Sequence, residues 1–153
     1  DFCLSRGLGD VYKRQEFNAA FNPEAVVKVT DVLLASHENT AQIIDARPAA
    51  RFNAEVDEPR PGLRRGHIPG ALNVPWTELV REGELKTTDE LDAIFFGRGV
   101  SYDKPIIVSC GSGVTAAVVL LALATLDVPN VKLYDGAWSE WGARADLPVE
   151  PEK

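Results

Sequence analysis

The sequence is poor in cysteine, histidine and positive charge, and it has no long apolar run. Its 153 residues include two cysteines and two histidines, and its formal net charge is −7. Cysteines without CxxC or Cys/His spacing indicate neither a disulfide framework nor a zinc site, and they favour a reducing, cytoplasmic setting. The acidic balance argues against nucleic acid or an anionic membrane surface as the main partner. The longest apolar stretch, residues 114–126, is too short to span a membrane.

The length and composition indicate one globular domain. With 45% hydrophobic and 25% charged residues, the chain can bury one full core but not two. The first fifteen residues differ from the rest, since they have no periodic pattern, no helix cap and no apolar segment typical of a signal peptide. We therefore expect residues 1–15 to be a disordered leader foreign to the domain. Residues 16–149 should form the domain, and residues 150–153 should fray.

Apolar runs alternate with helical patterns along the domain. Strands are expected at residues 26–29, 41–47, 71–76, 105–109 and 131–136, and helices at 31–39, 89–99, 114–126 and 137–144. Thr30 is the expected cap of the first helix, and Thr87 with Glu90 forms a capping box for the second. Residues 48–69 should form one long functional loop without secondary structure of its own. This alternation predicts an α/β fold with a central, mostly parallel sheet flanked by helices on both faces.

Cys110 lies where an apolar strand ends and a glycine-rich turn leads into a helix. Ligands collect at the carboxyl ends of parallel strands, and a helix amino end offers unpaired N–H donors. Gly111 and Gly113 would let successive N–H groups converge on the sulfur, and the hydroxyls of Ser112 and Thr115 would add donors. Such surroundings favour the nucleophilic thiolate. A buried structural cysteine is the alternative, but it leaves both glycines and both hydroxyls unexplained.

The residue six positions after Cys110 bears on the type of reaction. Protein tyrosine phosphatases also place a cysteine before a loop and a helix, and they use an arginine at that position to hold phosphate. Here the residue is Ala116. Phosphatase chemistry is therefore disfavoured.

Several stretches together resemble the rhodanese superfamily, and within it the carboxyl-terminal catalytic domain of bacterial mercaptopyruvate sulfurtransferases. These stretches are IIDARPAARF, EPRPGLRRGHIPGALNVPW, ELVREGELKTTDELDAIF, KPIIVSCGSGVTA and YDGAWSEWG, and the resemblance extends over residues 16–149. It implies a rhodanese-like fold in which the loop CGSGVT cradles a persulfide. Cys110 and Ser112 would then be catalytic, and Gly111, Gly113, Val114 and Thr115 would complete the cradle.

The resemblance also implies a reaction. Sulfur would pass from 3-mercaptopyruvate to cyanide, a small thiol or a thioredoxin-like dithiol through a Cys110 persulfide, with release of pyruvate and without a metal or organic cofactor. Arg51 of ARF and Arg60 of EPR fall in the motifs that hold the substrate carboxylate, which a planar guanidinium can bind bidentately. His67 of GHIPGA corresponds to a structural histidine.

Other basic and aromatic residues have simpler interpretations. Surface or ion-pair roles are expected for Arg47, Arg64 and Arg65, with Asp45 as a local partner for Arg47. The tryptophans of AWSEWG should pack the last helix beside the site.

Two alternatives stay open. Thiosulfate sulfurtransferases carry cations just after the cysteine, whereas this chain has Gly111 and Ser112, which suits a donor whose charge is a remote carboxylate. A non-catalytic rhodanese-like module that binds a partner or senses redox state is the other alternative. Relatives with two tandem domains use an inert amino-terminal domain to face the cysteine, and we expect that domain to be missing from this chain.

Overall fold

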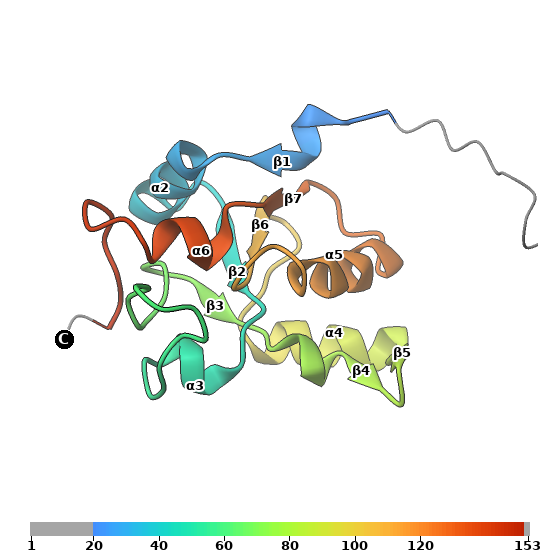
Figure 1. Ribbon diagram of the computed structural model, residues 1–153. Helices are drawn as coiled ribbons and strands as arrows, with labels where there is room; N and C mark the ends of the chain where they lie inside the picture. Colours follow the sequence, from blue (N-terminus) through green and yellow to red (C-terminus); the bar gives the residue numbers. More distant parts are fainter. Residues whose placement is uncertain (1–19, 152–153) are drawn as a thin grey trace, which may run out of the picture.

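The computed structural model describes residues 20–151 and contains a five-stranded sheet in which every pairing is parallel (Figure 1). The strand order is β1-β7-β6-β2-β3. The strands are β1 (Val26–Val27), β2 (Gln42–Asp45), β3 (Leu72–Asn73), β6 (Ile106–Ser109) and β7 (Val131–Tyr134). The parallel sheet is as the sequence predicts. The predicted leader lies outside the described residues, so that assignment stays a prediction.

The central strand, β6, and its neighbour β2 are apolar on both faces of the sheet. All four residues of β6 are buried, as are the last three of β2. Because successive side chains of a strand point to opposite faces, Ile44 and Val108 enter one core cluster, and Ile43 and Ile107 enter the other. Helices must therefore cover both faces.

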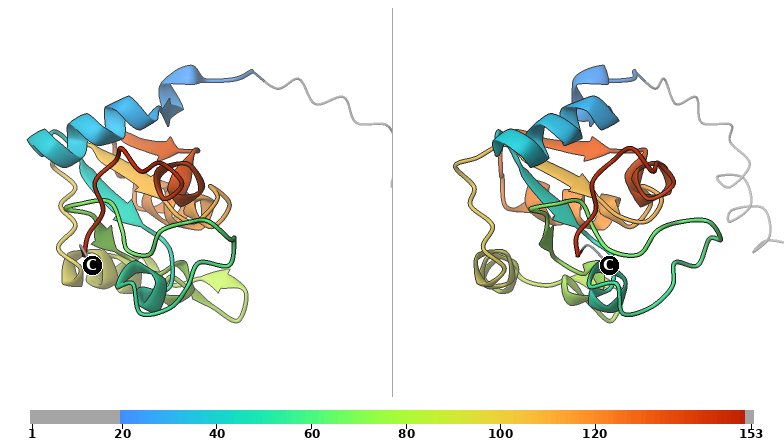
Figure 2. Two further views of the ribbon diagram at one scale, coloured as in Figure 1. Left: turned by 60° about the vertical axis from the view of Figure 1, so that its left-hand side comes forward. Right: turned by 90° about the vertical axis from the view of Figure 1, so that its left-hand side faces the viewer.

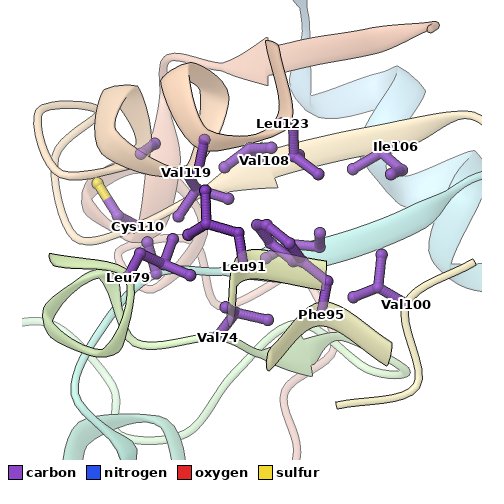
Figure 3. Packing of buried hydrophobic residues seen from close by; sticks show 14 residues of the cluster. Val74, Leu79, Leu91, Phe95, Val100, Ile106, Val108, Cys110, Val119 and Leu123 are labelled. Atoms are coloured by element: carbon purple, nitrogen blue, oxygen red, sulfur yellow. The ribbon is translucent and has the colours of Figure 1, made fainter. Parts of the chain in front are cut away.

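Four helices provide this cover, as the sequence predicts (Figure 1 and Figure 2). They are α2 (Val29–Glu38) and α6 (Ala137–Trp141) on one face, and α4 (Thr88–Gly97) and α5 (Ala116–Thr125) on the other. Figure 3 shows Leu91 and Phe95 of α4 packed with Val119 of α5 around Val108. Cys110 lies at the margin of this cluster, directly after β6.

The first strand is shorter, and the first long helix begins earlier, than the sequence predicts. The strand ends at Val27, and Lys28 rather than Thr30 is the residue that precedes the helix. The N–H of Lys28 donates to the carboxylate of Asp31 at 2.8 Å. This bond satisfies a backbone donor at the helix start without any side chain from Thr30, which lies in the first turn.

The segment between β2 and β3 is not entirely without secondary structure. It contains the short helix α3 (Ala49–Phe52), which begins directly after Pro48. Proline fixes its own φ and suits the start of a helix, so the prediction of an unstructured loop was wrong here. The rest of the segment, residues 53–69, contains no helix or strand of its own.

A β-hairpin that the sequence analysis missed precedes α4. Its strands are β4 (Val80–Arg81) and β5 (Glu84–Leu85), and its two turn residues, Glu82 and Gly83, have φ values of 54° and 87°. Positive φ at both central residues is typical of a type I′ turn. Two short 3₁₀ helices, η1 (Pro23–Ala25) and η2 (Trp76–Glu78), were also not predicted.

The predicted pairing of Thr87 with Glu90 at the start of α4 is confirmed. Both the N–H and the hydroxyl of Thr87 donate to the Glu90 carboxylate, at 3.1 and 3.0 Å. Arg81 of β4 contacts the same carboxylate. The Arg81 hydrogen bond and, after it, the Thr87 hydrogen bonds lower the pKa of Glu90 to about 2.

Helix α5 is apolar along almost its whole length. It begins at Ala116, two residues later than predicted, because Val114 and Thr115 belong to the turn that follows Cys110. Both Val114 and Leu121 are exposed. Within residues 20–151, none of the helices combines the length and apolar character that a membrane span requires.

Candidate active site

Cys110 follows the last residue of β6 at the carboxyl edge of the sheet. The neighbouring strand β2 ends in register with it, because Asp45 pairs with Ser109. The loop of residues 110–115 then leads into α5. The thiol therefore lies where a parallel sheet gathers ligands.

The Cys110 thiol is buried and accepts a backbone hydrogen bond. The residue is 1% exposed, and its Sγ lies 3.1 Å from the N–H of Gly113. Gly113 has a φ of +85°, and a Cβ atom there would be 2.9 Å from Oδ1 of Asp135. Both the backbone conformation and the close approach of Asp135 require glycine at this position.

The backbone of α6 fixes the carbonyl groups of the cysteine loop. The N–H of Trp138 donates to the carbonyl of Cys110 at 2.9 Å, and the N–H of Ser139 donates to that of Gly111 at 3.0 Å. No acceptor for the N–H groups of Gly111 and Ser112 is recorded among residues 20–151. These N–H groups are available to an anion bound at the loop.

The loop hydroxyls and Val114 differ from the sequence expectation. Among the described residues, the hydrogen bond recorded to Sγ is the one from Gly113, with none from the hydroxyls of Ser112 or Thr115. Val114 is 74% exposed, so its side chain is directed to solvent, and only its backbone is available to the loop.

Arg51 of α3 lies against the cysteine loop. Its Nε donates to Oε1 of Glu58 at 3.2 Å, and its Nη2 contacts Oε2 of the same carboxylate. A Cβ atom on Gly111 would be 2.8 Å from Nη2 of Arg51. Glu58 thus occupies one edge of the guanidinium, and the edge formed by Nη1 and Nη2 is left for a ligand.

Arg60 reaches the same loop through a serine. Its Nη1 donates to Oγ of Ser139 at 2.8 Å, and that hydroxyl donates to the carbonyl of Gly111 at 2.6 Å. Among the described residues, no carboxylate lies within ion-pair distance of Arg60. Its positive charge is therefore not offset by a neighbour.

A cleft of about 220 Å³ brings most of the predicted site residues together. Both arginines and three loop residues contribute to its walls, which consist of Arg51, Glu58, Pro59, Arg60, Leu63, Gly111, Ser112 and Thr115. Cys110, Gly113 and Val114 are not part of this lining. The cleft can hold a small carboxylate beside two guanidinium groups, next to the residue that bears the thiol.

Behind the cleft, Arg47 belongs to a buried charge network. The expected ion pair with Asp45 is present. The expected surface position is wrong, because Arg47 is only 1% exposed. Its Nη1 also donates to Glu58 at 2.7 Å, and its guanidinium lies 4.4 Å from the centre of the Trp138 ring. Glu58 therefore bridges Arg47 and Arg51. This pairing offsets the cost of burying its carboxylate.

The remaining arginines of this segment divide into two kinds. Arg65 forms an exposed ion pair with Asp57, as expected. Arg64 has no ion-pair partner within residues 20–151. Its guanidinium donates to the backbone carbonyls of Trp141, Gly142, Arg144 and Leu147. Arg64 is half-exposed and lies outside the cleft, so the expected surface position holds, but in place of an ion pair it ties residues 53–69 to α6 and the chain that follows it.

His67 has the structural environment that the sequence analysis expected. Its ring stacks on Phe52 with centroids 3.7 Å apart, and its Nδ1 lies 2.8 Å from the carbonyl of Phe52. Its Nε2 is 3.8 Å from a carboxylate oxygen of Glu150. These contacts join α3 to the chain terminus, and His67 does not line the cleft.

The tryptophans of α6 pack as predicted, and they lie beside a buried tyrosine. Trp138 and Trp141 are at most 1% exposed. The hydroxyl of Tyr134 donates to Glu140 at 2.7 Å. Burial and then the Glu140 carboxylate raise the pKa of Tyr134 well above its usual range, so the phenol stays protonated.

Sequence reasoning missed two residues of the site, Glu58 and Ser139. Glu58 directly precedes the Pro-Arg pair of the EPR motif, and a carboxylate beside predicted arginines was a usable signal. Ser139 stands between two tryptophans, and nothing in its spacing pointed to a loop 28 residues earlier. No group of three or more potential metal ligands occurs within residues 20–151.

Comparison with known proteins identifies a family and several similar enzymes. Residues 28–144 match the family model described as "Rhodanese-like domain". The 3-mercaptopyruvate sulfurtransferase of Escherichia coli K12 is 99% identical over 153 residues, which is 100% of this chain and 54% of that relative. That of Rattus norvegicus is 41% identical over 131 residues, 85% of this chain and 44% of the relative. The chain thus spans about half the length of the curated relatives that it matches.

Solved structures agree with the family match. The crystal structure of SseA from Escherichia coli superimposes with a TM-score of 0.70 at 97% identity, covering 82% of this chain and 46% of that one. Tum1 from Saccharomyces cerevisiae gives a TM-score of 0.75 at 28% identity, with coverage of 86% and 47%. The predicted rhodanese-like fold is confirmed.

Proposed function

The chain belongs to the family of rhodanese-like domains, and from this premise we propose that it is the catalytic part of a 3-mercaptopyruvate sulfurtransferase. The observation that carries the proposal is the position of Cys110. Its thiol accepts a backbone N–H, and it lies beside a cleft that contains two guanidinium groups. The identity to sulfurtransferases named for 3-mercaptopyruvate supports the same donor.

The proposed first step transfers sulfur to the enzyme. The Cys110 thiolate attacks the thiol sulfur of 3-mercaptopyruvate, an S–S bond forms and the C–S bond breaks. The electron pair of the broken C–S bond stays on the carbon, which gives the enolate of pyruvate. The thiol proton of the donor then protonates this enolate to give pyruvate. A Cys110 persulfide remains. The Gly113 N–H at the sulfur and the open N–H groups of Gly111 and Ser112 stabilise the sulfur anion.

The second step passes the outer sulfur to an acceptor. Cyanide would attack it and leave as thiocyanate. One thiol of a dithiol acceptor, such as a thioredoxin-like protein, would take the sulfur as a persulfide. The second thiol of the acceptor would then displace hydrosulfide and form a disulfide. In each case the Cys110 thiolate is regenerated. We assign these acceptors by their chemistry, together with a cytoplasmic location, where thiols stay reduced.

The two arginines are proposed to hold the donor's carboxylate. Glu58 offsets the charge of Arg51, whereas no carboxylate within residues 20–151 pairs with Arg60. The net charge of the cleft then suits a monoanion better than the dianion thiosulfate, which is the donor of the alternative sulfurtransferase. Ser112 lines the cleft. Its hydroxyl is proposed to donate to the outer sulfur once the Cys110 persulfide extends toward the cleft.

The whole protein is proposed to contain more than this chain. The curated relatives are about twice as long. An amino-terminal rhodanese-like domain would face Cys110 and complete the environment of the donor. Activity is therefore best measured in protein of the relatives' full length, alongside the present chain.

Product analysis tests the proposal. With cyanide as acceptor, turnover of 3-mercaptopyruvate should give pyruvate and thiocyanate in equal amounts, and Cys110→Ser should abolish both. Pyruvate formation that survives Cys110→Ser would contradict the nucleophile. Binding of 3-mercaptopyruvate without any product would favour the non-catalytic module, and a higher specificity constant for thiosulfate would favour the other enzyme.

A further inference from the structure

The hydroxyl of Ser139 connects the cleft to the cysteine loop. It accepts a hydrogen bond from Nη1 of Arg60 at 2.8 Å and donates one to the carbonyl of Gly111 at 2.6 Å. Arg60 and Ser139 are separated by 79 positions in the sequence, and Ser139 and Gly111 by 28. A single half-buried side chain on α6 thus joins three segments of the site.

We propose that Ser139 is a positioning residue for sulfur transfer, which sets Arg60 at a fixed distance from the loop of Cys110. The proposal rests on the function proposed above, because it assigns Ser139 to the same carboxylate site. Arg60 has no carboxylate partner among the described residues, unlike Arg51, which Glu58 holds. Without Ser139, its long side chain would lose the contact that orders it.

The direction of the hydrogen bonds supports this role. A hydroxyl has one proton, and that proton is committed to the Gly111 carbonyl, so its lone pair faces the Arg60 guanidinium. Donation from a charged group polarises the hydroxyl and strengthens its bond to the carbonyl. Arg60, Ser139 and Gly111 therefore form a polarised chain from the cleft to the loop.

The same chain orients a backbone donor at the site. In a trans peptide the C=O and the following N–H point in opposite directions. Because Ser139 holds the Gly111 carbonyl toward α6 with both its N–H and its hydroxyl, the N–H of Ser112 is directed away from α6. The contact that orders Arg60 thus also fixes an N–H group in the wall of the cleft.

Ser139 differs from residues that only support the fold. In Ser139→Ala, the backbone N–H of residue 139 still donates to the Gly111 carbonyl, so the loop keeps one of its two bonds there. Only the link to Arg60 is lost entirely. Ser139→Thr keeps the hydroxyl and should keep the link.

Alkylation of Cys110 tests this without relying on turnover. Iodoacetate and iodoacetamide react in the same way, since the thiolate displaces iodide and forms a thioether, but only iodoacetate carries a carboxylate. Rates at Cys110 are followed by peptide mass spectrometry, which separates Cys110 from Cys3. The ratio of the iodoacetate rate to the iodoacetamide rate then reports how well the arginines hold a carboxylate near the sulfur.

Ser139→Ala should lower this ratio by about 2- to 10-fold, the range for freeing one flexible side chain. Arg60→Ala should lower it at least as much, and adding Ser139→Ala to Arg60→Ala should lower it no further. Ser139→Thr should restore it. Ser36→Ala is the matched control, because the Ser36 hydroxyl also donates to a backbone carbonyl, that of Pro69, outside the cleft.

The outcomes distinguish this inference from the function on which it rests. A ratio that falls in Arg60→Ala but not in Ser139→Ala would overturn the role of Ser139 and leave the arginine site intact. Equal, additive losses in both variants would also overturn it. A ratio that does not change in Arg60→Ala, or no reaction of Cys110 with either reagent, would instead remove the proposed carboxylate site or nucleophile, and this inference with it.

Discussion

The guanidinium of Arg51 lies against the α-carbon of Gly111. A Cβ atom at position 111 would be 2.8 Å from Nη2 of Arg51, closer than Cβ atoms approach other groups in proteins. Arg51 cannot easily withdraw, because Glu58 holds its Nε and Nη2. The absence of a side chain after the cysteine and the position of this arginine are therefore linked, and the link bears on donor choice.

Donor choice should respond differently to a cation at Ser112 and at Gly111. Ser112 is exposed, so Ser112→Lys should raise the specificity constant for thiosulfate relative to 3-mercaptopyruvate, since a dianion gains more from an adjacent cation. Gly111→Lys should instead impair both donors, because it collides with Arg51. Steady-state kinetics with both donors decide this, and an unchanged ratio in Ser112→Lys would refute the neutral-loop argument.

Arg51→Lys and Arg60→Lys should weaken use of 3-mercaptopyruvate. Lysine keeps the charge but loses the planar fork, at a cost of about 1 to 3 kcal/mol for a charge-assisted hydrogen bond. That is roughly 5- to 150-fold in kcat/KM. Because the carboxylate is present in substrate and transition state alike, much of the loss should appear in KM.

The control for these variants comes from the same loop. Arg65→Lys changes an exposed arginine that pairs with Asp57 outside the cleft, and it should behave like the unsubstituted protein. Arg64 is unsuitable as a control because it holds four backbone carbonyls. Equal losses in all three variants would mean that a general electrostatic field, rather than a carboxylate contact, is responsible.

Glu58→Gln should destabilise the fold as well as the site. Glu58 is buried between Arg47 and Arg51, and removing its charge leaves the Arg47 guanidinium with Asp45 as its remaining carboxylate. Loss of one partner from a buried ion pair typically costs about 3 to 5 kcal/mol. Urea denaturation measures the free energy of unfolding. Asp57→Asn, which breaks an exposed pair, should leave it nearly unchanged, and similar small effects in both variants would contradict a structural role for Glu58.

The contribution of Glu90 to stability should depend on pH. Its pKa is about 2 in the folded protein against an ordinary 4.5, so the folded state favours the carboxylate. Its contribution is therefore present above about pH 4.5 and is lost as the pH falls toward 2. The difference in free energy of unfolding between the unsubstituted protein and Glu90→Gln should shrink across this window. A difference that stays constant from pH 6 to pH 2.5 would contradict the assigned cause.

The sequence predicted those strands, helix starts and turns whose signals come from residues close together in the chain. The consecutive β-branched residues Ile43 and Ile44 identified β2, the apolar run at residues 105–109 identified β6, and the Thr87 and Glu90 pair identified the start of α4. The turn after Cys110 was also identified, although α5 begins two residues later than expected. These features depend on residues close together in the chain.

Contacts between distant segments were not predictable in the same way. The burial of Arg47, the backbone contacts of Arg64 and the link from Arg60 through Ser139 to Gly111 depend on how loop 53–69 folds against α6. A serine or arginine in a polar segment has the same sequence pattern whether it is solvated or tied to a carbonyl. The hairpin of β4 and β5 was missed because each of its two-residue strands pairs an apolar residue with a charged one, so neither strand gives an apolar run in the sequence.

The most direct test of the central claim is the mass of the protein after incubation with 3-mercaptopyruvate. If Cys110 is the sulfur-accepting nucleophile, one sulfur atom, about 32 Da, should be added, and peptide analysis should place it on Cys110 as a persulfide that cyanide removes. Cys110→Ser should gain nothing, while Cys3 stays unmodified. An adduct on Cys3, or no adduct on Cys110 in folded protein of the relatives' full length, would contradict the account.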